Sequence, residues 1–158
     1  MRILYFLTIQ IALMFSVFAQ ESTFTPPENF IRNQDAVAET YINTGAAATI
    51  QISKLENVDL NSFYENFNKD QFFENGLEII TENANIIDDV VQSFYYTCKY
   101  VIQQEHEGQI SEFMRIIYFT ENNGTLIMAV ASFPLISVDL LQKPIIESFN
   151  NMIEEEEK

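Results

Sequence analysis

Few residues in this chain of 158 could carry out covalent chemistry. His106 is its only histidine, and it lies between Glu105 and Glu107. A histidine in such a setting could bind a metal ion or transfer protons near neutral pH. A zinc site of the usual type needs further ligands, and the two glutamates point to opposite sides if the segment is extended. We therefore predict no metal and no cofactor, and we interpret His106 as a solvated loop residue.

Cys98 is the only cysteine, so no disulfide can form within the chain. It lies eight residues before His106, roughly 26 Å away along an extended strand at about 3.3 Å per residue, too far for a thiol–imidazole pair. Cys98 alternates with Phe94, Tyr96 and Tyr100, a pattern typical of a small buried thiol on an aromatic strand face. The chain also lacks a Gly-x-Ser-x-Gly elbow. We predict no catalytic residue; a hydrolase that uses His106 with nearby carboxylates is the alternative.

The candidate binding residues are Arg115, Tyr95 and Tyr118, all placed by their spacing on predicted strands. An arginine in the middle of a strand either pairs with a carboxylate, lies across the outer face of the sheet, or binds an anionic group of a ligand. Tyr95 and Tyr118 are predicted as outer-face aromatics that could form a recognition patch, because exposed aromatic side chains often anchor protein partners.

Charge narrows the classes of partner. The chain has 23 acidic and 8 basic residues, and its net charge is −15. Such a surface repels nucleic acids and anionic lipid headgroups, so we expect neither as a partner. The acidic groups at 88–89 and 154–157 could bind cations weakly, but no Asp-x-Asp-x-Asp-Gly loop is present. A solvated acidic surface and a weak cation binder are the two interpretations of these groups.

The first nineteen residues have the pattern of a secretory signal peptide. Arg2 precedes an apolar run at 3–18, and Val17-Phe18-Ala19 fits cleavage after Ala19. As a helix this run spans about 24 Å, less than the hydrocarbon core of a bilayer at ~30 Å. We expect a protein that is secreted, to a periplasm or outside the cell, with no membrane attachment after leader removal. Residues 20–153 then form a single domain, followed by an acidic tail at 154–158.

Alternating apolar residues and turn signals predict strands that are joined mainly by hairpins. One helix is predicted at 59–76, with Asp59 as its N-cap and Gly76 as its stop. A second helix is predicted at 137–153, where Pro144 either kinks the helix or begins its main part. The predicted strands are 38–42, 47–53, 77–84, 90–104, 109–119 and 125–133. The expected fold class is α+β, a mainly antiparallel sheet with two helices packed against it.

Several stretches resemble the PsbP-like superfamily, which includes the Ran-binding Mog proteins and bacterial DcrB-type envelope proteins. The sequence Phe-Thr-Pro-Pro-Glu-Asn-Phe at 24–30 is similar to the opening of that group. The segments 48–52 and 129–134 are similar to its first and last core strands. The helix at 59–76 and the helix that contains 145–149 are similar to its first and closing helices. The resemblance implies a PsbP-like sandwich and a small, secreted, bacterial, non-enzymatic domain. Such a domain would bind another envelope or extracellular protein. No residue of this chain matches a ligand set of that group.

Overall fold

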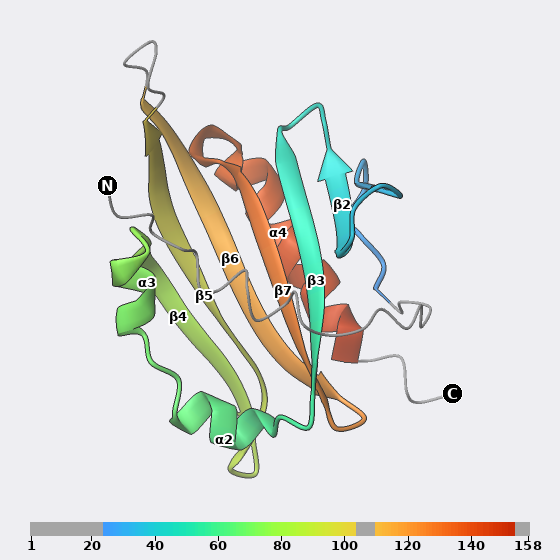
Figure 1. Ribbon diagram of the computed structural model, residues 1–158, viewed down its shortest axis with the longest axis vertical. Coiled ribbons are helices and arrows are strands. Elements are labelled where there is room, and N and C mark those ends of the chain that lie inside the picture. The colour runs from blue at the N-terminus through green and yellow to red at the C-terminus, as the bar shows by residue number, and fades with distance from the viewer. Residues whose placement is uncertain (1–23, 104–109, 154–158) are drawn as a thin grey trace.

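The computed structural model describes residues 24–103 and 110–153. The predicted leader, the loop that holds His106 and the acidic tail lie outside the described residues. The described chain forms one seven-stranded antiparallel sheet in the order β1-β2-β3-β7-β6-β5-β4 (Figure 1). The α+β class predicted from the sequence is therefore confirmed. The strands are β1 (Ile31–Arg32), β2 (Glu39–Asn43), β3 (Ala48–Glu56), β4 (Glu78–Ile87), β5 (Val90–Gln103), β6 (Ile110–Asn122) and β7 (Thr125–Pro134).

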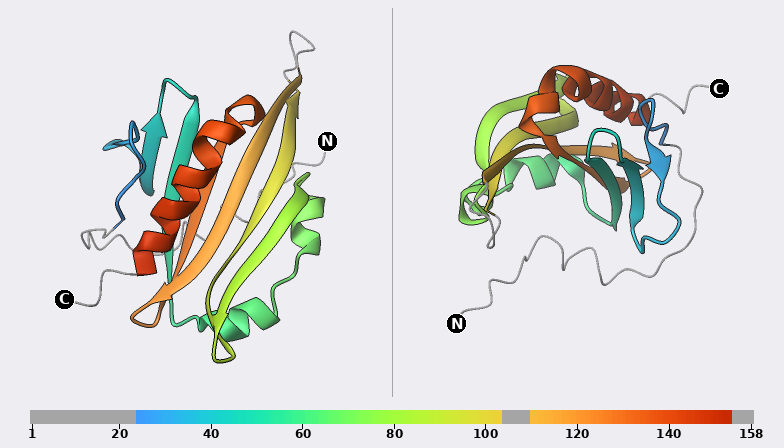
Figure 2. Two further views of the ribbon diagram at one scale, coloured as in Figure 1. Left: turned by 180° about the vertical axis from the view of Figure 1, so that it is seen from behind. Right: turned by 90° about the horizontal axis from the view of Figure 1, so that it is seen from above.

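Helices lie on both faces of the sheet (Figure 2). The helix α4 (Val138–Asn150), flanked by the short 3-10 turns η2 (Leu135–Ser137) and η3 (Asn151–Ile153), crosses one face. The shorter helices α2 (Leu60–Glu65) and α3 (Asp70–Glu74) lie on the opposite face, beside β4 and β5. Within the described part of the chain, no helix is both long enough and apolar enough to cross a membrane.

The face under α4 holds the first of two apolar cores. Ile145 and Phe149 of α4 are fully buried against residues of β3, β6 and β7, among them Ile50, Ile116 and Ala131. Since strand side chains alternate between faces, the alternate positions of these strands supply this core.

The second core lies on the other face, under α2 and α3. Phe94 and Tyr96 of β5 pack there against Leu60 of α2 and Phe72 of α3. The ring of Phe94 stacks on Phe119 with the ring centroids 4.7 Å apart. Because α4 lies on one side of β6 and α2 on the other, both sets of alternating residues in its central part are largely buried.

The helix predicted at 59–76 is two helices in the structure. Its start is confirmed, because the Asp59 side chain accepts a hydrogen bond from the amide of Ser62. Its predicted continuity is wrong. The Asn66 side chain donates to the carbonyl of Ser62, and the Asn68 side chain accepts from the amide of Asp70. Asparagine side chains that bond to the nearby backbone compete with helical hydrogen bonds, which explains the break between the two helices.

Pro144 lies inside α4, so the main helix does not begin there. Pro144 lacks an amide hydrogen for the carbonyl of Leu140. Both residues are exposed, so water can solvate this carbonyl on the outer side of the helix.

Candidate functional site

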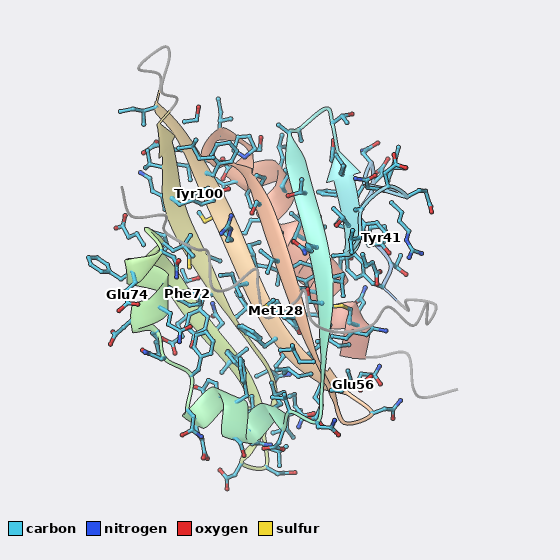
Figure 3. The ribbon with its side chains drawn as sticks, viewed as in Figure 1. Tyr41, Glu56, Phe72, Glu74, Tyr100 and Met128 are labelled. Carbon is cyan, nitrogen blue, oxygen red and sulfur yellow. The ribbon has the colours of Figure 1, made fainter. Side chains whose placement is uncertain are left out.

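Part of the sheet face that carries α2 and α3 is left uncovered by either helix. It runs over β2, β3 and β7 to the upper parts of β6 and β5, and Figure 3 labels Tyr100 near its upper end and Met128 nearer to α2. Strand pairing places Arg115 beside Ser132, and Ser132 beside Thr49, with these side chains on the same face. We call this strip the open face, and none of its residues is fully buried: Thr40, Ile42, Thr49, Gln51, Ser53, Tyr100, Phe113, Arg115, Val130 and Ser132.

Arg115 is held in place by two neighbours on the open face. Its guanidinium carbon lies 4.5 Å from the ring centroid of Tyr100, a cation–π contact. Its Nε donates a hydrogen bond to the Ser132 Oγ at 3.1 Å. Tyr100 in turn stacks on Phe113 with a centroid distance of 5.4 Å and an interplanar angle of 24°. The guanidinium is thus oriented by an aromatic ring and a hydroxyl.

Arg115 is the only charged side chain of the open face. In the described part of the chain it forms no ion pair, whereas three lysines do. Those pairs are Lys69–Glu82, Lys99–Glu112 and Lys143–Glu147. The sequence-based alternative in which Arg115 pairs with a carboxylate of its own chain is therefore wrong for the described residues. Among the described residues, the guanidinium is thus unpaired on a surface that is otherwise uncharged.

Cys98 is the strand neighbour of Arg115 on the side of β5. Its thiol is fully buried, as the alternation with aromatic residues predicts. Burial raises the pKa of Cys98 to about 11, and the nearby charge of Arg115 offsets this only in part. Since the thiolate is the nucleophilic form, this cysteine is unreactive near neutral pH.

Tyr95 and Tyr118 lie on the opposite side of the sheet from Arg115, and the structure does not bring the three residues together. Tyr118 is fully buried under α4, and its hydroxyl donates to the Asn150 Oδ1 at 3.0 Å. Tyr95 is partly buried and stacks against Tyr118 with a centroid distance of 6.0 Å. The prediction of an outer-face patch is wrong for Tyr118, because α4 covers the face on which it lies. Tyr100 and Ser132 contact Arg115, and the sequence pattern predicts neither of them as a binding residue.

Arg115 lines neither of two shallow hollows on the described surface. One, of about 400 Å³, lies along α4 between Val138 and Glu147. The other, of about 530 Å³, lies at the upper end of β6 and β7 and is lined by Phe113, Pro134 and Ile136 among others. Phe113 belongs to both this second hollow and the open face, so the two surfaces adjoin.

The acidic groups give no metal centre in the part of the chain that the structure describes. No group of three or more His, Cys, Asp or Glu side chains that could hold a metal ion is found there. Asp88 and Asp89 occupy the turn between β4 and β5 with φ of 50° and 64°. Positive φ at both central residues is the geometry of a tight hairpin turn, which aspartate tolerates well, so the turn accounts for this pair.

Comparisons with known proteins give similarity in fold. No family model matches the sequence. No curated protein matches it either. Among solved structures, the chain is similar to the Saccharomyces cerevisiae Ran-binding protein Mog1p, with 16% identity over 84% of this chain and 85% of that one and a TM-score of 0.49.

Two further solved structures are similar to a comparable degree. PsbP (CyanoP) from Synechocystis sp. PCC 6803 is 15% identical over 80% of this chain and 82% of its own, with a TM-score of 0.47. LpqN of Mycobacterium tuberculosis, which is involved in cell envelope biogenesis, is 12% identical over 84% of this chain and 79% of its own, with a TM-score of 0.48. All three TM-scores lie below 0.5. This similarity assigns no activity and no partner to the chain.

Proposed function

We propose that this protein is an exported, non-enzymatic domain that binds another envelope or extracellular protein through its open face. The observation that carries the proposal is the composition of that face. It combines one arginine with Tyr100 and Phe113, and it holds no lysine, aspartate or glutamate. The cores of protein interfaces are similarly enriched in arginine and aromatic residues and depleted of other charges. The secretory signal pattern at 1–19 supports export.

The apolar character of the open face supports the same proposal. Ile42, Val130, Tyr100 and Phe113 are only partly buried, and the first two lie on strands on either side of β3. An exposed apolar surface with polar neighbours such as Thr49 and Gln51 is typical of a binding site. The acidic residues among those that the structure describes lie elsewhere, so a partner that covers the open face would bury none of their carboxylates.

Site-specific photo-cross-linking in the cells that make the protein tests this proposal. A photoreactive amino acid at Gln51, which is exposed on β3, should yield an adduct with a second protein. The same group at Lys143 on α4, whose side chain is 83% exposed, serves as the control because it lies on the other side of the sheet. Equal adduct yields at both positions, or no adduct at Gln51, would contradict the proposal.

The hydrolase alternative is tested in the same cells. His106 lies outside the described residues, and a hydrolase that depends on it would lose its function in a His106→Ala variant. A binding domain that uses the open face should keep its full adduct yield at Gln51 in that variant. A loss of both the cellular phenotype and the adduct would instead favour a function centred on His106.

A further inference from the structure

We infer that Arg115 is the receptor for one carboxylate side chain, an aspartate or a glutamate, of the protein segment that lies on the open face. This inference rests on the proposed function, and it names the chemistry that the partner must supply. It follows from the hydrogen-bonding state of Arg115, from the neighbours that fix its orientation, and from the charge of the surroundings.

Arg115 has unused hydrogen-bond donors. A guanidinium carries five N–H groups, of which one is on Nε and four are on the two Nη atoms. The Nε group donates to the Ser132 Oγ, while the Nη groups have no hydrogen-bond partner among the described residues. The Ser132 hydroxyl accepts this bond, so its own hydrogen is available to a ligand. The site therefore offers several hydrogen-bond donors, and no carboxylate of the described residues on the open face competes for them.

The site is organised before a ligand arrives. The cation–π contact with Tyr100 and the hydrogen bond from Nε to the Ser132 Oγ both restrict the position of the guanidinium. A planar carboxylate accepts two parallel N–H bonds from such a fork, and a lysine cannot reproduce this geometry. Since the arginine is already ordered, binding costs less side-chain entropy than it would at a mobile surface residue.

Charge and shape favour a single carboxylate side chain over other anions. The chain has a net charge of −15, and the open face holds no second cation, so a polyanion would be repelled. Arg115 lines neither of the two hollows described above, and it lies in the middle of β6. A side chain that reaches down from a segment crossing a flat sheet face fits this geometry.

The surroundings also define the residues near that carboxylate. Arg115 lies next to Tyr100, which stacks on Phe113, and Phe113 borders the hollow of about 530 Å³ at the end of β6. The partner segment should therefore carry apolar residues beside its acidic one. A single carboxylate in such a segment should bind an arginine on an apolar face more strongly than one in bulk water, because the low local dielectric strengthens the ion pair.

The test measures adduct yield at Gln51 in four otherwise identical chains: wild type, Arg115→Gln, Arg115→Lys and Arg32→Gln. Arg32 is the matched control, because it is the only other arginine outside the leader and is exposed on the edge strand β1. We expect Arg115→Gln to lower the yield at least about tenfold, and Arg115→Lys to restore it only in part. Arg32→Gln, with the same change in net charge, should leave the yield unchanged. Thermal unfolding of each variant confirms that it is folded.

Mass spectrometry of the adduct identifies the partner segment. The inference predicts an aspartate or glutamate in the cross-linked peptide, and its replacement by the amide should lower the yield as Arg115→Gln does. An unchanged yield in Arg115→Gln would overturn the inference and leave the binding function intact. A cross-link to a second copy of this chain, or to a peptide without an acidic side chain, would overturn it as well. Absence of any adduct in the wild-type chain would contradict the proposed function itself.

Discussion

Phe149 packs α4 against one face of the sheet, on the side opposite to the open face. Its replacement tests this packing. Its ring is fully buried and lies 5.5 Å from the ring of Tyr118 and 5.9 Å from that of Phe24, measured between centroids. Truncation of a buried phenylalanine to alanine costs about 3–5 kcal/mol, because transfer energy and packing are lost together. At about 4 °C per kcal/mol for a domain of this size, the Tm should fall by roughly 12–20 °C.

The assay is urea and thermal unfolding followed by far-UV circular dichroism. Leu140→Ala on the same helix is the matched control, because Leu140 is 77% exposed and its truncation should change the free energy of unfolding by less than about 0.5 kcal/mol. A Phe149→Ala variant that loses less than about 1 kcal/mol would refute the packing of α4 described above. So would equal losses in the two variants.

Three further predictions concern other buried or constrained residues. Tyr118→Phe removes the hydrogen bond to Asn150 and should lower the free energy of unfolding by about 1 kcal/mol in urea titrations, and a stabilised variant would contradict this contact. The pKa of Cys98 is raised to about 11 from an ordinary value of 9, so the unfolded chain releases this proton first. Stability should accordingly fall as the pH rises from about 9 towards 11, and Cys98→Ala should weaken the fall in urea midpoint between pH 8 and pH 10. Gly124→Ala should lower the free energy of unfolding by about 1 kcal/mol in urea titrations, because φ is +73° and the added carbon meets no other atom, so backbone strain is the only cost. Gly45→Ala, where φ is not positive, should lower it much less.

Six of the seven strands and their alternation could be predicted because they depend on local sequence, whereas the two-residue strand β1 was not. The period of two along β5 and β6 correctly places Cys98 with the aromatic residues and places Arg115 on the same face as Phe119. The tight turn at Asn123-Gly124 also follows from residue type, since both residues adopt positive φ. These features need no knowledge of how distant segments pack.

The exposure of each face could not be predicted from alternation. Tyr118 was expected on an outer face, but α4 packs there, and alternation cannot tell which of two faces a distant helix covers. The contact between Arg115 and Ser132 depends on the register between β6 and β7, and the contact with Tyr100 on that between β5 and β6. Each register is set by a whole hairpin rather than by the residues in contact. The open face becomes recognisable only when β3 is placed beside β7.

A double-mutant cycle between Arg115 and the partner carboxylate tests the central claim most directly. The dissociation constants of four combinations are measured by calorimetry: wild-type or Arg115→Gln chain, each with the natural partner segment or with its acidic residue replaced by the amide. The account predicts a coupling energy of at least about 1.5 kcal/mol, as found for close charge pairs across interfaces. Additive effects of the two changes, with a coupling energy near zero, would contradict it.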